Sequence, residues 1–530
     1  MSVRLALGRV TLSNLWDRLA EVYGGRLAFT LEDPVWLGPL RGKRVTYADA
    51  AAAVARMTRV LVEAGAGPGK RVAICAPNRI DYAFALFAAI RAGAVAVPLH
   101  HHLKAHELAS MVKLAGAQLV VSETNVPGVR TVRSGGGGDL DVDVARYGAV
   151  GLGREDPAVI LFTSGTTGKP KGATLTSRSL LAVARLAALA PVRVLGEETG
   201  ICGLPLAHVM GLSTMLCAAM AGAPLHWLTK FEPQVVLDRI EELEPSFFVG
   251  VPAMYAMLAE ARPERRDLSS IKLFASGADA MPPALVERFV KLGCSARLPS
   301  GAPLFTAAFA EVYGMVELSG PAIVKVTPGR PVEGLRTAKL LKRLRKADSQ
   351  EPKGFPIPPY RARIVDADGR EVPPGEVGEL VLRGPGVMKG YSEGGGPTGD
   401  GWLHTGDLAR RSRLGLIAFV TRKKDVVKHG GFSVFPAEVE AQLCEHPHVA
   451  EAVVFGMPHP TKGAVPVAAI VPRGRVTEAE LLAWAREHIA PYKSPRAIVL
   501  VSAAEIPRNA NKKVLKDELK ERLLPRMTRA

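Results

Sequence analysis

Short apolar runs alternate with longer segments of helical spacing through the first four hundred residues, and this alternation constrains the fold more than any other feature. Residues 71–77 read RVAICAP, a strand-like run ended by proline, and residues 81–94 read DYAFALFAAIRAGA, with helical spacing. The strand-like AVAVPL (94–99), the helical HELASMVKLAGA (106–117) and the strand-like AQLVVSE (117–123) repeat the pattern. Strands that alternate with helices form parallel sheets covered by helices. We therefore expect an α/β fold with a large N-terminal domain of helix-covered sheets.

The last hundred residues have the pattern of a separate, small α/β domain. Two helical segments alternate with apolar runs that read as strands: FPAEVEAQLCEHP (435–447), VAEAVVFGMP (449–458), VPVAAIVP (465–472), TEAELLAWAREHIAPYK (477–493) and AIVLVSA (497–503). The charged segment TRKKDVVKHGG (421–431) precedes them, ends in glycine and suits a hinge. We therefore predict a large N-terminal domain and, after this hinge, a compact α/β lid with its own small core.

The composition narrows the partners and the compartment. The 530 residues carry a formal net charge of +17, which favours polyanionic partners such as nucleotides, coenzyme A or an anionic membrane, or simply a basic, soluble surface. No zinc-finger spacing and no aromatic-and-basic RNA-binding motif occurs, so we expect no nucleic-acid partner. The five cysteines are odd in number, widely spaced and never CxxC, which indicates a reducing compartment.

Residues 199–229 contain no Asp, Glu, Lys or Arg, so a membrane span has to be considered. Pro205, His208, Gly222 and Pro224 interrupt the stretch, and a buried strand, a turn and a core helix fit it better. The first 25 residues lack the continuous apolar core of a signal peptide. We therefore expect a cytoplasmic protein.

The stretch FTSGTTGKPKG (162–172) concentrates hydroxyls, glycines and lysines as a phosphate-binding loop does. A Walker A loop has the spacing G-x-x-x-x-G-K-[ST], whereas here only two residues separate the glycines and Pro170 follows the first lysine. Glycines let backbone N–H groups turn toward a polyanion. The other donors and charges come from Thr163, Ser164, Thr166, Thr167, Lys169 and Lys171. The apolar run at 158–162 reads as a buried strand, which places the loop at a strand's C-terminal end, where α/β proteins bind ligands.

This loop resembles the phosphate-binding signature of the adenylate-forming (ANL) superfamily, which includes acyl-CoA synthetases, firefly luciferase and the adenylation domains of peptide synthetases. Six further segments resemble the family's other motifs and occur in the family's order: GLPLAHVMGL (203–212), LFASGADAMP (273–282), EVYGMVELSG (311–320), GWLHTGDLARR (401–411), TRKKDVVKHGGFSVFPAEVE (421–440) and IPRNANKKVLKDEL (506–519). The resemblance covers nearly the whole chain and points to the acyl-CoA synthetase, or fatty-acid–CoA ligase, branch. It implies ATP, Mg²⁺ and coenzyme A as cofactors.

The resemblance also implies roles in adenylation, which joins a carboxylate to the α-phosphate of ATP and expels pyrophosphate. Glu317 is the implied Mg²⁺ ligand, Asp407 the ribose ligand, and His208 a further residue of the catalytic set. Lys513 is the implied catalytic lysine, which neutralises the carboxylate and the α-phosphate as they approach. Tyr313 is expected to stack on adenine. The implied nucleotide-binding set is Thr163, Ser164, Gly165, Thr166, Thr167, Gly168, Lys171, Gly277, Ala278, Asp279, Tyr313, Gly314, Val316, Asp407 and Arg422.

In this family a second half-reaction transfers the acyl group to coenzyme A after the lid has rotated. The resemblance places the hinge at Lys424, two residues after the motif's arginine. It therefore implies an N-terminal AMP-binding domain at 1–423 and a small, mobile C-terminal lid domain at 424–530. After rotation, His429, Gly430 and Gly431 are implied to face the site, where the glycines let a pantetheine arm pass close to the backbone.

Val316 departs from the family, which has threonine at this position. The hydroxyl that would bond the α-phosphate is absent, and a hydrogen bond to a charged group is worth about 1.5–3 kcal/mol. Its loss slows adenylation about ten- to hundredfold unless something compensates. We expect an active enzyme because the other implied residues remain, and a degenerate nucleotide- or lipid-binding relative is the alternative.

Residues 100–106, HHHLKAH, offer imidazoles at metal-ligand spacing, with His102 and His106 four apart. No cysteine or acidic cluster accompanies them, and in the family this stretch begins an ordinary surface helix. We expect such a helix here rather than a metal site.

The segments that resemble the acyl pocket are apolar, and HVMGL (208–212) has no acidic residue to receive an amino group, which argues against amino-acid adenylation. We expect a medium- or long-chain fatty acid, with an aryl acid as the next choice and a fatty acyl-AMP ligase that loads a carrier protein as an alternative reaction. The segment LRTAKLLKRLRKADSQ (335–350) is either a solvated loop or a basic amphipathic piece in peripheral contact with the inner membrane face. The sequence is compatible with a monomer and with a homodimer.

Overall fold

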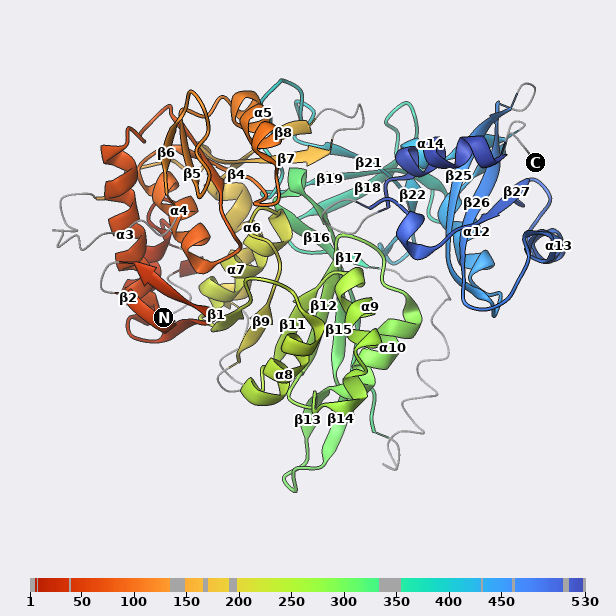
Figure 1. Cartoon of the computed structure of the whole chain (residues 1–530), viewed down its shortest axis with the longest axis horizontal. Helices are drawn as coiled ribbons and strands as arrows, with labels where there is room; N and C mark the ends of the chain where they lie inside the picture. The colour runs from red at the N-terminus through yellow and green to blue at the C-terminus, as the bar shows by residue number, and fades with distance from the viewer. Residues whose placement is uncertain are drawn as a thin grey trace. The chain divides into compact units, whose positions relative to one another are not determined.

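The computed structural model describes the chain except for residues 1–4, 7, 38–39, 134–147, 165–169, 190–197, 333–353, 430–431, 460–462, 509–513 and 528–530. The chain divides into two compact units (Figure 1). The first comprises Met1–Gln350, Pro356–Arg361 and Arg383–Leu403, and the second Glu351–Phe355, Ala362–Leu382 and His404–Ala530. Both units combine helices with sheets, so the expected α/β class is confirmed. The second unit includes residues before 424, and the boundary between 423 and 424 stays a prediction about the segment that moves as a lid.

One sheet of the first unit is mainly parallel. Its order, after the two-residue edge strand β17 (Phe355–Pro356), is β16 (Gly320–Thr327), β15 (Ala308–Met315), β12 (Leu273–Gly277), β11 (Phe247–Gly250), β9 (Gly200–Cys202), β10 (Leu225–Trp227), β1 (Leu27–Leu37) and β2 (Leu40–Thr46). Neighbours from β15 to β1 are parallel, whereas β16 and β2 pair antiparallel with β15 and β1. Parallel neighbours end at the same edge of a sheet, which gathers the loops after β12 and β15.

The other large sheet of this unit contains the strands that the sequence pattern predicts. Its order is β20 (Gly390–Tyr391), β8 (Pro170–Thr176), β7 (Pro157–Ser164), β4 (Val95–Pro98), β3 (Arg71–Cys75), β5 (Leu119–Ser122) and β6 (Arg130–Val132). Helix α4 (Ile80–Arg91) joins β3 to β4 and is buried at every position, which explains why its sequence is apolar on all sides. Helix α5 (Ala105–Ala115) joins β4 to β5 and buries Leu108, Val112 and Ala115.

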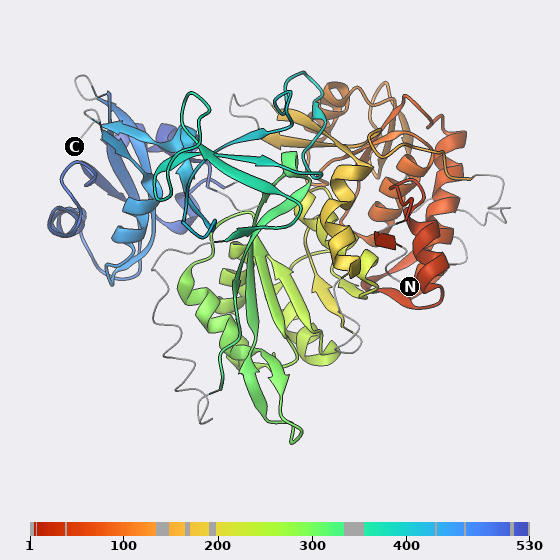
Figure 2. The same ribbon diagram turned by 180° about the vertical axis from the view of Figure 1, so that it is seen from behind.

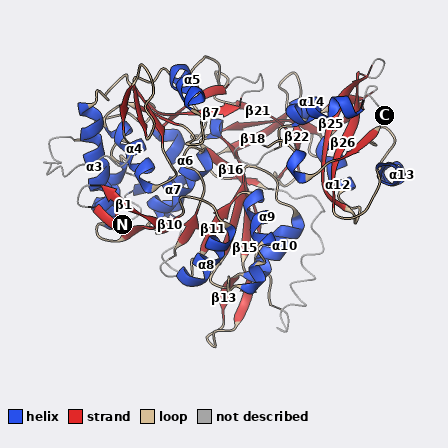
Figure 3. Ribbon diagram, viewed as in Figure 1, coloured by secondary structure: helices blue, strands red, loops and turns tan. Residues whose placement is uncertain are grey.

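Helices cover the sheets of the first unit (Figure 3). They are α2 (Leu15–Tyr23), α3 (Tyr47–Glu63), α4, α5, α6 (Ser177–Leu189), α7 (Val209–Ala221), α8 (Pro233–Leu243), α9 (Pro252–Glu260) and α10 (Pro283–Leu292). Apolar side chains of α8, α9 and α10 form one core with β11, β12 and β15, to which Phe248, Tyr255, Phe274, Phe289 and Phe309 contribute fully buried rings. A hairpin of β13 (Cys294–Arg297) and β14 (Pro303–Thr306) follows α10.

The uncharged stretch 199–229 folds as β9, α7 and β10, so the interpretation as strand, turn and core helix is correct. Helix α7 has thirteen residues, and among the helices that the structure describes none is both long and apolar enough to cross a membrane.

The second unit contains two sheets, the larger of them in the blue part of Figure 2. One has the order β18 (Arg361–Val365), β19 (Val377–Arg383), β21 (Leu403–Arg411) and β22 (Ile417–Arg422). The other has the order β24 (Phe432–Val434), β23 (Val427–His429), β26 (Gly463–Pro472) and β25 (Val449–His459), with β27 (Ala497–Leu500) paired parallel to β26. Helices α12 (Pro436–Leu443) and α13 (Glu478–His488) supply Val439, Leu443 and Leu481 to its core, and α14 (Lys516–Met527) supplies Leu519 and Leu523 to a second cluster.

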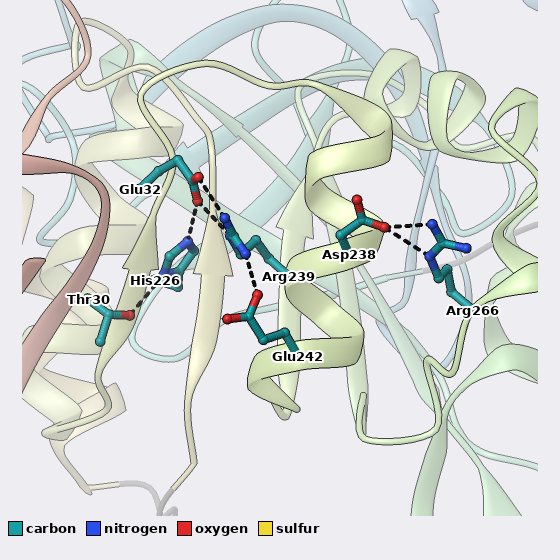
Figure 4. Close-up of polar contacts among 7 residues, drawn as sticks. All are labelled: Thr30, Glu32, His226, Asp238, Arg239, Glu242 and Arg266. Carbon is teal, nitrogen blue, oxygen red and sulfur yellow. Dashed lines mark hydrogen bonds and ion pairs between the residues drawn. The ribbon is translucent and has the colours of Figure 1, made fainter.

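A charged network joins β1, β10 and α8 (Figure 4). Arg239 donates from Nε and Nη2 to the two carboxylate oxygens of Glu32 at 2.8 and 3.0 Å. His226 contacts the same carboxylate at 3.3 Å and Thr30 at 2.9 Å. The bonds from Arg239 lower the pKa of Glu32 to about 2, against the opposing effect of burial. The pair therefore favours an ionised Glu32 across the neutral range.

Candidate active site

Glu317 lies in a short 3₁₀ turn, η4 (Val316–Leu318), directly after β15. Its side chain is buried, and Oε1 accepts a hydrogen bond of 2.9 Å from the hydroxyl of Tyr391. The backbone is held as well, since Met388 N donates to Glu317 O at 2.8 Å. Within the described residues, Oε2 accepts no hydrogen bond, so one oxygen of a fixed carboxylate is free for a hard cation.

Tyr391 reaches Glu317 because β20 pairs with β8, with Tyr391 opposite Ala173. Burial and the negative charge of Glu317 raise the pKa of Tyr391, so its hydroxyl stays protonated and donates. The Lys171 ammonium lies 5.5 Å from the centre of the Tyr391 ring, within the range of a cation–π contact. One ring therefore contacts a cation at its face and a carboxylate at its hydroxyl.

The phosphate loop joins β7 to β8, which form an antiparallel hairpin with Thr163 opposite Lys171 and Ser164 opposite Pro170. The loop thus begins at the C-terminal end of a buried strand, as the sequence predicts. Thr163 Oγ1 donates to Lys171 O at 3.5 Å. The loop itself, with Gly165, Thr166, Thr167, Gly168 and Lys169, lies outside the described residues.

The expected adenine segments end two neighbouring parallel strands. Gly277 ends β12 opposite Val312 of β15, and Tyr313 and Gly314 continue β15 toward η4. A Cβ on Gly314 would lie 2.1 Å from Gly320 O, so only glycine allows β15 and β16 to approach this closely. Ala278 has φ of 72°, a left-handed conformation that costs a non-glycine residue about 1–2 kcal/mol. Ala278 and Asp279 are exposed, as a ligand-contacting loop requires.

His208 precedes the first turn of α7, and the segment before it is held by Asn78, a residue outside the sequence motifs. Asn78 is buried and donates from Nδ2 to the carbonyls of Leu204 and Leu228 at 3.2 and 3.4 Å. Its Oδ1 accepts from Leu206 N at 2.9 Å, so one side chain holds the segment that leads to His208. Burial lowers the pKa of His208 to about 4, and its Nε2 is buried without a hydrogen-bond partner among the described residues. A neutral imidazole therefore stands here at neutral pH.

The second unit carries the remaining candidates. Asp407 on β21 is paired in register with Arg422 on β22, and Arg422 Nε lies 3.8 Å from Asp407 Oδ1. Lys424 lies in the turn η6 (Lys423–Asp425), with its ammonium 3.6 Å from Asp517. His429 is buried and its Nδ1 lies 2.7 Å from Tyr492 O. Lys513, Gly430, Gly431 and residues 335–350 fall outside the described part of the chain.

The structure thus gathers Glu317 and Lys171 around a tyrosine that the sequence did not single out. Tyr391 stands 74 residues from Glu317 and belongs to none of the seven motif segments. The glycine-rich stretch after Gly390–Tyr391 was the local signal, and glycine clusters mark loops of many kinds.

Comparisons with known proteins identify the family of the chain. The family model described as AMP-binding enzyme matches residues 16–392, and the model for the AMP-binding enzyme C-terminal domain matches residues 438–513. A feruloyl-CoA synthase of Amycolatopsis sp is 32% identical, with 91% of this chain and 94% of that protein covered. A 2-succinylbenzoate–CoA ligase of Geobacillus kaustophilus is 31% identical, with 92% and 94% covered.

Solved structures extend the likeness to the whole fold. MatB from Rhodopseudomonas palustris with bound ATP has a TM-score of 0.77 and 26% identity, and the match covers 97% of this chain and 99% of that one. The o-succinylbenzoate coenzyme A synthetase of Bacillus subtilis, in complex with ATP and a magnesium ion, has a TM-score of 0.75 and 27% identity, covering 96% and 99%. ATP, Mg²⁺ and coenzyme A are the cofactors of such ligases, as the sequence analysis expects. The chain belongs to the AMP-binding enzyme family, within the adenylate-forming superfamily.

Proposed function

We propose that this chain is an AMP-forming acid–thiol ligase that activates a carboxylic acid with ATP and transfers the acyl group to coenzyme A. The observation that carries the proposal is the buried carboxylate of Glu317, oriented by Tyr391 beside the lysine that ends the phosphate loop. A carboxylate with one restrained and one free oxygen fits Mg²⁺, which prefers oxygen ligands, so Glu317 would hold the ion. When bound, the ion neutralises the charge of the phosphates.

The protein's own groups supply the rest of the chemistry. Lys171 and the N–H groups of the phosphate loop are proposed to hold the pyrophosphate that leaves, and Asp407 to accept hydrogen bonds from the ribose hydroxyls. Tyr313 would stack on the adenine. Lys513 is proposed to neutralise the approaching carboxylate and α-phosphate. The lid at 424–530 would then turn about Lys424 and bring the backbone at 429–431 to the thiol substrate.

For the acid, we propose an aromatic carboxylic acid in place of the fatty acid expected from sequence. The relatives named above are a feruloyl-CoA synthase and a 2-succinylbenzoate–CoA ligase, and a 4-coumarate–CoA ligase of Oryza sativa is 29% identical over 95% of this chain. The segments 208–216 and 247–258 contain no acidic residue, so they suit an aromatic ring as well as an alkyl chain. Gly277 approaches Met210, where a Cβ would lie 3.1 Å from the methionine methyl group, so an apolar side chain borders the adenine loop.

The test is pyrophosphate release from purified protein with ATP, Mg²⁺ and a panel of cinnamates, benzoates and fatty acids of graded length. We expect kcat/KM for the best aryl acid to exceed that for every fatty acid by about tenfold, roughly 1.4 kcal/mol of transition-state binding. If a fatty acid instead has the highest kcat/KM, the substrate is the medium- or long-chain fatty acid expected from the sequence. No pyrophosphate with any acid, despite ATP binding, would favour the degenerate nucleotide- or lipid-binding relative.

The acceptor is tested by the release of AMP. If coenzyme A is the acceptor, AMP release after acyl-adenylate formation accelerates with added coenzyme A and not with a phosphopantetheinylated carrier protein. The opposite dependence would assign the chain to the carrier-loading enzymes.

A further inference from the structure

His100, His101 and His102 occupy the turn between β4 and α5. Leu99 N donates to Ile74 O at 2.7 Å on one side of the triplet, and Leu103 N donates to His100 O at 3.2 Å across it. These bonds restrain the backbone, so three consecutive imidazoles extend from one tight turn. Helix α5 begins after them at Ala105, which agrees with the expected surface helix, and His106 is exposed on its first turn.

The three imidazoles converge. Each residue has a ring nitrogen within 4.8 Å of those of the other two. Ring centres lie 5.0 Å apart for His100 and His101, 4.9 Å for His100 and His102, and 3.8 Å for His101 and His102. Zinc–nitrogen bonds of about 2.1 Å in a tetrahedral site place the nitrogens about 3.4 Å apart. Side-chain rotations that move the nitrogens by about 1 Å would therefore complete the geometry.

The ring nitrogens have few other partners. In the described part of the chain, the hydrogen bond that reaches these rings is a long one, 3.3 Å from His102 N to His100 Nδ1. Burial lowers the pKa of His100 to about 4 and also lowers the pKa of His101, with a further contribution from the neighbouring imidazoles. The neutral imidazole, with a lone pair on one ring nitrogen, is the form that binds metal.

His208 adds a fourth imidazole. Its ring centre lies 5.7 Å from that of His100, and its buried Nε2 lacks a hydrogen-bond partner within the described residues. The carboxylate of Glu123 attracts positive charge at His101, although Arg79 also pairs with it at 3.1 Å. A water, an ion or a catalytic role accounts for a polar atom that is buried without a protein partner.

We propose that His100, His101 and His102 bind a divalent transition-metal ion such as Zn²⁺, with His208 as the neighbouring fourth imidazole. Imidazole nitrogen suits zinc, copper and nickel, whereas Mg²⁺ prefers oxygen, so this site is chemically distinct from the carboxylate of Glu317. Because metal binding would restrain His208, we also expect occupancy to slow adenylation, a consequence that rests on the proposed function.

The binding test uses the full-length chain without a polyhistidine tag, titrated with Zn²⁺ against a chromophoric chelator. We expect one tight equivalent for the wild type. His100→Asn, His101→Asn and His102→Asn should each weaken this binding about tenfold or more, since even outer-shell changes cost about 10–100-fold. The matched control is His106→Asn, which removes an exposed imidazole four residues from His102 and should leave the affinity unchanged.

Two results would overturn the proposal: the triplet variants keep the wild-type affinity, or His106→Asn weakens binding as much as they do. His102 is exposed, so His102→Asn keeps the test decisive if the more buried variants unfold. Co²⁺ absorption should show a tetrahedral spectrum that weakens in His208→Asn, while an unchanged spectrum would remove His208 from the site. Binding is measured directly, so a chain inactive as a ligase would leave the metal result intact.

Discussion

Tyr391→Phe tests whether the hydroxyl that holds Glu317 contributes to magnesium-dependent adenylation. The substitution removes one oxygen and keeps the ring, so the contact with Lys171 at 5.5 Å survives. What is lost is the 2.9 Å hydrogen bond to Glu317 Oε1. The buried carboxylate would then lack this donor and be free to rotate away from its ligand orientation.

The magnitude follows from the energy of that bond. A hydrogen bond to a charged group contributes about 1.5–3 kcal/mol, and leaving a buried charged acceptor unpaired costs a similar amount. Since 1.36 kcal/mol corresponds to a factor of ten, kcat/KM at limiting Mg²⁺ should fall about 10–100-fold. The Mg²⁺ concentration that gives the half-maximal rate should rise, because a carboxylate that is free to rotate binds the ion more weakly.

The assay is the initial rate of pyrophosphate release as a function of free Mg²⁺. Tyr360→Phe is the matched control, because Tyr360 is buried and its hydroxyl donates to Leu318 O, one residue from Glu317, at 2.7 Å. It should lower the free energy of unfolding by about 1 kcal/mol and leave the Mg²⁺ dependence unchanged. If Tyr391→Phe changes half-saturating Mg²⁺ by less than about twofold, or if both variants shift it equally, the positioning role of Tyr391 is wrong.

The remaining predictions concern rate, stability and pH. Val316→Thr restores the hydroxyl of the family motif and should raise the rate of pyrophosphate release about tenfold, whereas an unchanged or lower rate would show that the hydroxyl is not missed. Asn78→Ala removes three hydrogen bonds and leaves the buried N–H of Leu206 without this acceptor. Urea denaturation should therefore show a free energy of unfolding lower by about 2–3 kcal/mol, and a decrease below about 0.5 kcal/mol would contradict this. Glu32→Gln breaks the ionic pair with Arg239. Because the pKa of Glu32 is lowered from 4.5 to about 2 in the folded chain, the pair's stabilisation, about 1 kcal/mol, is present above about pH 4.5 and lost as pH falls toward 2. The difference in Tm between variant and wild type should therefore narrow from about pH 6 to about pH 3.

Glu232→Gln serves as the control for the last measurement. Glu232 pairs with Lys230 at 2.6 Å, but both side chains are largely exposed, and such surface pairs contribute about 0–1 kcal/mol. Its Tm difference should stay small at every pH. If the difference in Tm between Glu32→Gln and the wild type is the same at every pH, the ion pair with Arg239 does not lower the pKa of Glu32.

Local patterns in the sequence predicted the helices and strands whose burial follows directly from the order of apolar and polar residues. The strands β3, β4 and β5 and the helices α4 and α5 lie where apolar runs and helical spacing predicted them, and the uncharged stretch 199–229 became β9, α7 and β10. Burial of one face leaves a hydrophobic period in the sequence, and burial of all faces, as in α4, leaves a continuous apolar run. The motifs likewise predicted family membership, because each is a short, contiguous string of residues.

The contacts that organise the site depended on pairings between distant segments. Tyr391 meets Glu317 only because β20 pairs with β8, and Asn78 holds Leu206 across 128 residues. The spacing within residues 100–106 pointed to His102 and His106 as the pair that could bind a metal. The turn instead brings together the rings of His100, His101 and His102, beside His208. Sequence by itself determined the α/β class, the order of the motifs and the residues available for chemistry. Only the tertiary structure decided which side chains meet, because hydrogen bonds and ring contacts form between segments that strand pairing and turn geometry bring together, and neither leaves a local period in the chain.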